Sequence, residues 1–154
     1  MYPVLLSIHS LIRWVVVVSM ALSLITAWQG MRSNRSFTAR DVLLRRVTVA
    51  SVHIQLVLGL WLYFISPVVH YFLANFSTAV HMREIRFFGM EHITMMMTSV
   101  VLITIGASKS RRKATDKEKF RTIAIWYSIA FIIMFFSIPW AFSPLTHRPF
   151  FRAL

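Results

Sequence analysis

The chain has 154 residues, of which 57% are hydrophobic and only 14% are charged. A soluble domain carries about 25% charged residues, so this composition favours a membrane protein. The 17 Lys and Arg residues outnumber five Asp and Glu residues, giving a net charge of +12, and they gather between apolar stretches. The absence of cysteine excludes disulfides, thiolate metal sites, iron–sulfur clusters and covalently attached c-type haem.

Four apolar stretches follow one another, each long enough to cross a hydrocarbon core of about 30 Å. They predict membrane-spanning helices over residues 4–28, 47–66, 87–106 and 122–142. Between the second and third stretches, residues 67–86 predict a short amphipathic helix on the membrane surface. No internal repeat or flexible linker divides the sequence, so residues 1–154 are expected to form a single all-α domain.

The basic residues predict the orientation of these helices. The first and third connections carry five and seven Lys and Arg residues, whereas the second carries only Arg83 and Arg86. Cytoplasmic loops are enriched in Lys and Arg. The sequence therefore predicts an up-down-up-down four-helix bundle with both termini on the outer, periplasmic side. The basic run over residues 109–121 is explained by this topology and by anionic lipid headgroups, not by nucleic acid.

Two histidines are predicted to lie at the same depth in the membrane. His9 and His92 lie about six and five residues inside the outer ends of two helices that run in the same direction, or roughly 8–9 Å deep. In a simple up-down bundle these helices are diagonal and leave room between them. Two facing imidazoles suit the axial ligation of a haem b iron. The alternative is that each histidine only forms a hydrogen bond between helices.

His53 is expected about 10 Å deeper than this level, and the fourth span contains no histidine. The sequence thus predicts at most one bis-histidine haem, with His53 as a reserve partner or as the ligand of a second, five-coordinate site. Thr48, Ser51 and Gln55 lie on the opposite face of the same helix. This two-sided polarity is typical of a helix that touches a second protein, or of hydroxyls that bond their own backbone.

Arg13 lies one turn beyond His9 on the same helical face and close to the bilayer centre, so it needs a partner. Glu91, the only acidic residue in the predicted spans, and a haem propionate are equally good candidates. Glu91 is also a hypothetical proton relay to a quinone. Met95 and Met96 share a face with His92, and thioethers with imidazole bind Cu(I), although ordinary packing is the stronger explanation for these methionines.

Three segments carry a resemblance to a known family: HSLIRW (9–14), HIQLVLGLWLYF (53–64) and EHITMM (91–96). With them the chain resembles, over nearly its whole length, a family of small bacterial four-helix membrane proteins labelled cytochrome b-like. The resemblance implies an integral b-type cytochrome of the bacterial plasma membrane. It places His9, His53 and His92 at the family's histidine positions.

Two functions follow as hypotheses. The first is an electron-transfer protein, rather than a turnover enzyme, that exchanges electrons with a quinone or a larger redox complex through haem b held by His9 and His92. The second is a cofactor-free accessory subunit that docks in a larger membrane complex. Both have the lipid bilayer as a partner, and both allow a homo-oligomer.

Overall fold

The computed structural model describes residues 1–141 and residue 146, and this part of the chain consists of helices and short connections, without strands. Its long helices are α1 (Tyr2–Ser33), α2 (Ala39–Ile65), α6 (His92–Arg111) and α7 (Asp116–Ser137). Between α2 and α6 lie three short helices and a π-helical turn: α3 (Pro67–Ala74), α4 (Phe76–Ala79), α5 (Arg83–Arg86) and η1 (Phe87–Glu91).

The long helices have the length and composition of membrane spans. Four segments qualify, with α5, η1 and α6 counting as one segment, Arg83–Arg111. Their outward faces expose large apolar side chains, which water would disfavour and lipid accommodates. On α1 these are Leu11, Val15, Val18, Leu22 and Ile25, and on α7 they are Ile125, Ile129, Ile132 and Phe136. The chain thus has the build of a multi-pass membrane protein.

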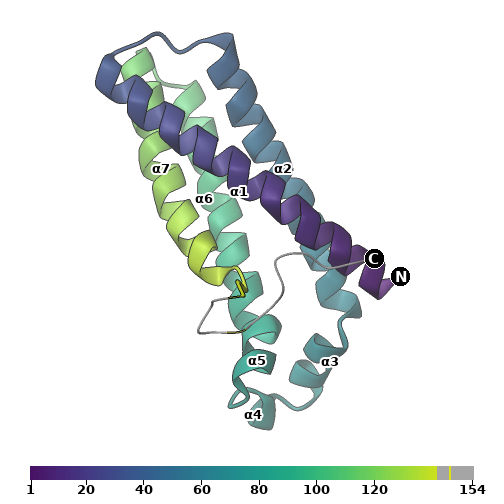
Figure 1. Ribbon diagram of the computed structural model, residues 1–154. Helices are drawn as coiled ribbons and strands as arrows, with labels where there is room; N and C mark the ends of the chain where they lie inside the picture. Colours follow the sequence, from purple (N-terminus) through teal and green to yellow (C-terminus); the bar gives the residue numbers. More distant parts are fainter. Residues whose placement is uncertain (142–145, 147–154) are drawn as a thin grey trace.

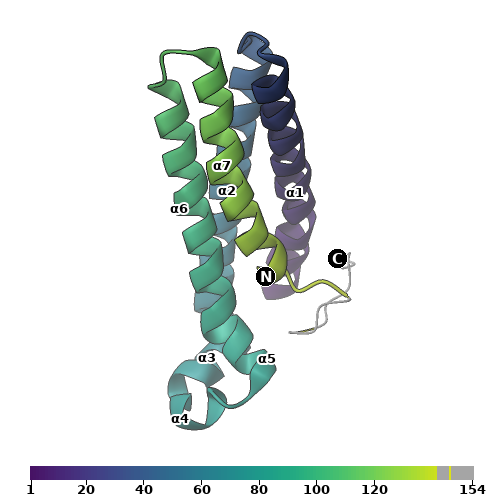
Figure 2. The same ribbon diagram turned by 90° about the vertical axis from the view of Figure 1, so that its left-hand side faces the viewer.

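The four long helices pack in a ring. Helix α7 packs closely against α6 and α1, α1 also packs against α2, and α2 meets α6 less extensively. Helices α1 and α6 are therefore the diagonal pair, as the sequence predicts. The α1–α2 and α6–α7 connections lie together at one end of the bundle, and α3, α4 and α5 lie at the other (Figures 1 and 2).

The core lies between α1, α6 and α7. Its largest fully buried side chains include Met20, Ile103, Phe120 and Tyr127. Gly106 lets α6 approach α7 closely, since a Cβ atom there would lie 2.5 Å from Cβ of Trp126. Small residues at helix contacts are the usual means of close packing in membrane bundles.

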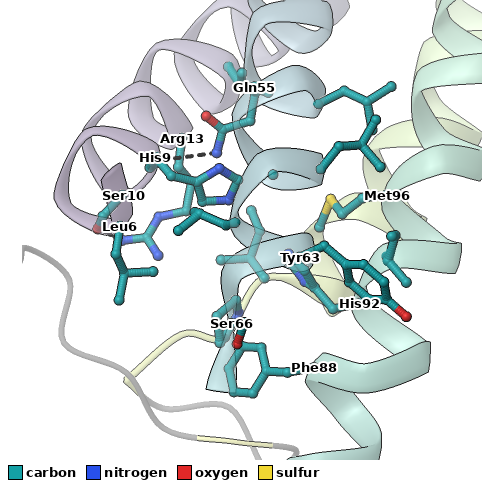
Figure 3. Close-up of a pocket in the computed structure, with 18 of the residues that line it drawn as sticks. Leu6, His9, Ser10, Arg13, Gln55, Tyr63, Ser66, Phe88, His92 and Met96 are labelled. Atoms are coloured by element: carbon teal, nitrogen blue, oxygen red, sulfur yellow. Dashed lines mark hydrogen bonds between the residues drawn. The ribbon is translucent and has the colours of Figure 1, made fainter. Parts of the chain in front are cut away.

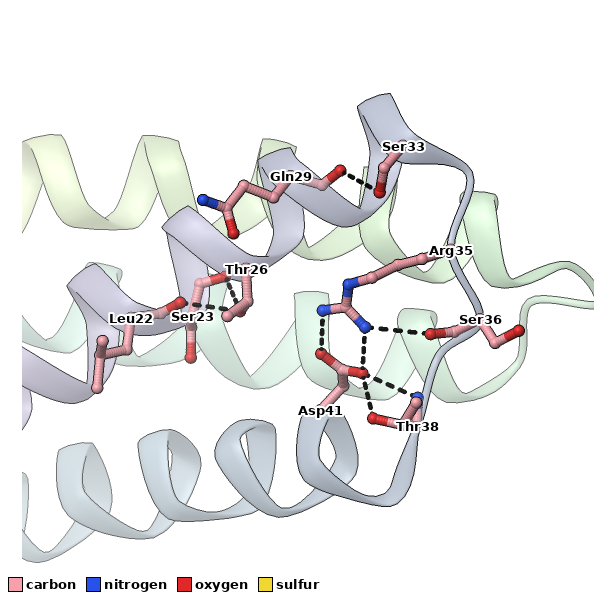
Figure 4. Close-up of polar contacts among 9 residues, drawn as sticks. All are labelled: Leu22, Ser23, Thr26, Gln29, Ser33, Arg35, Ser36, Thr38 and Asp41. Atoms are coloured by element: carbon pink, nitrogen blue, oxygen red, sulfur yellow. Dashed lines mark hydrogen bonds and ion pairs between the residues drawn. The ribbon is translucent and has the colours of Figure 1, made fainter.

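Polar groups define the turn between α1 and α2 (Figure 4). Asn34, in the left-handed conformation with φ of 51°, ends α1. The Asp41 carboxylate begins α2 by accepting hydrogen bonds from the backbone N–H and the hydroxyl of Thr38, both at 2.8 Å. It also binds Arg35 at 2.7 Å, and this bond raises the pKa of the Arg35 guanidinium. The turn is thus fixed by one carboxylate.

The helix boundaries differ from the predicted spans. Helix α1 ends at Ser33 instead of residue 28, and α2 begins at Ala39 instead of residue 47, because polar turns continue each helix beyond its apolar stretch. Helix α7 ends at Ser137 instead of residue 142, which lies outside the described residues. Ile138 precedes Pro139 and is extended, with φ of −75° and ψ of 130°. A residue before proline is disfavoured in the helical region, which explains this early end.

The segment 67–86 is helical, as expected, but it forms α3, α4 and α5 rather than one helix. Asn75 interrupts it with φ of −127° and ψ of 42°. The short helices fold back onto η1 at the end of the bundle.

Candidate ligand cavity between the helices

A cavity of about 390 Å³ lies between α1, α2 and α6 at the end of the bundle that carries α3. Ligand sites typically have volumes of about 300–1,000 Å³ and mostly apolar walls with a few polar groups. The walls here are mainly Leu, Val, Ile and Met side chains. Figure 3 shows the polar groups: His9, Ser10 and Arg13 come from α1, Gln55 and Tyr63 from α2, and His92 from the start of α6.

His9 is held against α2. Gln55 Nε2 donates a hydrogen bond to the His9 carbonyl oxygen at 2.9 Å. One turn further along α2, Gly59 makes room for the ring, since a Cβ atom there would lie 3.2 Å from His9 Cε1. Nδ1 faces this side, is buried and has no hydrogen-bond partner in the described part of the chain. The imidazole lines the cavity, and no protein group among the described residues binds its Nδ1.

His92 is held against the end of α7. Its Nδ1 lies 2.8 Å from the carbonyl oxygen of Ser137. A carbonyl oxygen only accepts hydrogen bonds, so Nδ1 carries the proton and Nε2 keeps its lone pair. Metal-bound histidines are commonly oriented by such a bond to a backbone carbonyl. Phe87 and Phe88 pack beside the ring, with ring centroids 5.6 and 6.2 Å away.

Of the two partners predicted for Arg13, Glu91 and a haem propionate, Glu91 forms no salt bridge with it in the structure. Glu91 Oε1 pairs with Arg86 Nε at 2.6 Å instead. The two residues are five apart, and the π-helical turn between them brings their side chains together, which an α-helix does not do at that spacing. Arg13 lines the cavity, with Nη2 3.3 Å from Ser10 Oγ.

His53 does not join the other two histidines. It is exposed on the outer face of α2 and is not among the cavity residues. Its Nδ1 donates to the Val49 carbonyl oxygen at 2.7 Å, and its Nε2 lies 3.4 Å from Thr104 Oγ1 on α6. His53 thus lies outside the cavity that His9 and His92 line.

The polar side chains on the face of α2 opposite His53 form hydrogen bonds with α1. Thr48 Oγ1 lies 2.8 Å from Ser23 Oγ, and Ser51 Oγ lies 3.2 Å from Ser19 Oγ, all of them buried. This face is the contact with α1 and not a surface for a second protein.

Met96 lines the cavity beside His92, whereas Met95 does not. Within residues 1–141 and 146, no group of three or more His, Cys, Asp and Glu side chains is placed to hold a metal ion. In the described part of the chain, these four residue types therefore form no site that holds an ion by three or more side chains.

Several residues of the site were not predicted from the sequence. The carbonyl of Ser137, the hydroxyl of Tyr63 and the backbone of Gly59 give no motif. The sequence contained one indication of these contacts, the spacing of Gln55 and Gly59. It places a side-chain amide and a residue without a side chain one turn apart on the same face of the helix.

No family model, no curated protein and no solved structure matches the chain. The resemblance to cytochrome b-like proteins therefore stays a prediction. What the structure defines is a class: a multi-pass helical membrane protein with an apolar cavity that two histidines enter from diagonal helices.

Proposed function

We propose that this protein is a membrane b-type cytochrome that binds haem b between His9 and His92. It exchanges electrons with a quinone or with a larger redox complex. The observation that carries this proposal is the pair of imidazoles on diagonal helices that line one cavity, of which His92 has its Nδ1 proton bound to a backbone carbonyl. Such a histidine presents a lone pair on Nε2, the atom that ligates haem iron.

The lining residues fit this cofactor. Haem needs apolar walls that exclude water from the macrocycle, and Val52, Leu56 and Ile93 supply such walls. Its propionates need a cation or water at one edge. Arg13 is the only described lining residue with a permanent charge, and it would hold a propionate. The iron would supply the one-electron chemistry, and the bundle would bind and shield it.

The topology belongs to the same proposal. The four helices cross the bacterial plasma membrane up-down-up-down, with both termini on the outer side. The basic α1–α2 and α6–α7 connections support this orientation, because Lys and Arg are enriched in cytoplasmic loops. The cavity would then lie in the outer half of the membrane.

A visible spectrum of the detergent-purified protein tests the proposal. We expect reduced-minus-oxidised bands of b type and, by pyridine haemochrome assay, about one haem per chain. His92→Ala and His9→Ala should each lose the low-spin bis-histidine spectrum while still inserting into the membrane. His81→Ala, an exposed histidine outside the cavity, is the matched control and should retain it. A featureless spectrum from folded protein would overturn the proposal.

His53 favours a second candidate function, a subunit of a larger membrane complex. Its imidazole is exposed on a face that is otherwise apolar, next to Ile54 and Val57. Thr104 Oγ1, the neighbour of His53 Nε2 at 3.4 Å, donates its proton to the Val100 carbonyl oxygen at 2.7 Å. Polar groups facing lipid are costly, and a partner protein would offer His53 Nε2 a stronger hydrogen-bond donor. Co-purification of a partner that His53→Leu abolishes, from a preparation without haem, would favour this function over the first.

A further inference from the structure

The turn of π-helix that immediately precedes His92 is fixed by contacts from two other helices. This turn, η1, covers Phe87–Glu91, and α6 begins at His92 itself. A π turn inserts one extra residue into a helix, which rotates the residues on either side by roughly 100° relative to an uninterrupted α-helix. The direction in which His92 points therefore depends on whether η1 keeps this conformation.

Tyr63 on α2 forms the first contact. Its hydroxyl donates a hydrogen bond to the carbonyl oxygen of Gly89, in the middle of η1, at 2.9 Å. The same Tyr63 side chain lines the cavity (Figure 3). This bond links α2, the helix that supports His9, to η1, the turn that immediately precedes His92.

Phe72 on α3 forms the second contact. Its ring is buried and packs directly on the backbone of Gly89, where a Cβ atom would overlap with ring carbons. Glycine is therefore required at this position for α3 and η1 to pack together. The ion pair between Arg86, the residue before η1, and Glu91, the last residue of η1, spans the turn.

The contacts that Tyr63 and Phe72 make with Gly89 influence the orientation of His92, whose Nδ1 is bound to the Ser137 carbonyl oxygen. If η1 relaxed to an α-helical turn, His92 would rotate and its Nδ1 would leave the Ser137 carbonyl oxygen. We propose that Tyr63, acting through Gly89, is a positioning residue that aims His92 Nε2 into the cavity. Its effect on haem binding rests on the proposed function, whereas its effect on the His92 ring does not.

Tyr63→Phe removes the hydroxyl alone, and Tyr127→Phe is its matched control. Tyr127 is buried in the same bundle, and its hydroxyl has no hydrogen-bond partner among the described residues. In haem-loaded protein, Tyr63→Phe should weaken haem binding by about two- to tenfold, the range of one hydrogen bond. It should also shift the low-spin electron paramagnetic resonance signal. Tyr127→Phe should change neither.

A second readout uses the protein without haem. The ¹⁵N chemical shifts of the His92 ring should report a fixed Nδ1–H tautomer in the wild type and a tautomer mixture in Tyr63→Phe. Unchanged ring shifts, haem affinity and resonance signal in this variant would overturn the positioning role. If the wild type binds no haem, the proposed function fails, and the ring shifts still decide whether Tyr63 positions His92.

Discussion

Arg13 has its charge within an apolar helix, where an unpartnered guanidinium would be costly. Its guanidinium carbon lies 5.7 Å from the Trp14 ring centroid and 5.9 Å from that of Trp140. Indole faces attract cations, so the two rings stabilise the charge beside the cavity. The positive charge of Arg13 is thus placed where it would interact with an anion or a redox centre bound in the cavity.

Replacing Arg13 by Gln is expected to lower the midpoint potential of the bound haem. Reduction adds one negative charge, and a nearby positive charge favours it. At a separation of about 10 Å and an effective dielectric constant of about 20, the interaction is roughly 1.7 kcal/mol. The potential should therefore fall by about 70 mV, since a one-electron couple changes by 59 mV per tenfold. Redox titration of the purified variant measures this shift.

Arg46→Gln is the control, because it removes the same charge from an exposed position near the other end of α2. It should leave the potential within a few millivolts of wild type. A potential that is insensitive to Arg13 but changes with Arg46 would show that the charge beside the cavity is not near the redox centre.

The contacts among the candidate site residues were partly predictable from the sequence. The equal depth of His9 and His92 follows from counting residues in two apolar stretches, and both line the same cavity. Glu91, one of the two partners predicted for Arg13, pairs with Arg86 instead, and this pairing depends on a π turn that no residue pattern marks. The exclusion of His53 follows from its helical face, but only once α1 is known to cover the opposite side.

Helices α1 and α2 are joined by polar groups at successive turns. Ser23 meets Thr48, Ser19 meets Ser51, and Gln55 binds the backbone of α1 at His9. In a bilayer there is little hydrophobic gain from bringing two helices together, so such bonds help to select the partner and the register. The register in turn places His9 beside Gly59.

A double-mutant cycle on Ser23→Ala and Thr48→Val should reveal this link. We expect a coupling energy of about 0.6 kcal/mol, with about 1.7 kcal/mol as the upper bound for such bonds in membrane proteins. Unfolding of the detergent-solubilised protein by added denaturing detergent measures the four stabilities. The control cycle pairs Thr48→Val with Ser33→Ala, whose hydroxyl instead bonds Gln29 on its own helix. Equal coupling in the two cycles would contradict a direct contact.

The helices themselves were easier to predict than their ends. Long apolar stretches must be helical in a bilayer, because every backbone polar group needs an internal partner there. The ends depend on local chemistry outside those stretches, such as the Thr38–Asp41 bonds and Pro139. The three short helices between α2 and η1 depend on contacts such as Phe72 on Gly89, which join residues distant in sequence.

The two ends of the whole molecule differ in charge and in packing. One end carries the α1–α2 and α6–α7 connections with most of the basic residues, and a narrow crevice lies there. The other end carries α3, α4, α5 and the cavity. If the basic end is cytoplasmic, a redox centre in the cavity lies nearer to the outer surface and exchanges electrons there.

The absence of cysteine makes this orientation directly measurable, because any introduced cysteine is the only thiol in the chain. Ser36 in the α1–α2 connection and Ser77 in α4 are both exposed. In intact spheroplasts, a membrane-impermeant maleimide should label Ser77→Cys, but it should label Ser36→Cys only after permeabilisation. The wild type should remain unlabelled. The reverse pattern would place the cavity in the inner half of the membrane, and labelling of both sites from outside would mean that α2, the long helix between them, does not cross it. The first of these results would move the proposed electron exchange to the inner surface, and the second would contradict the proposed topology.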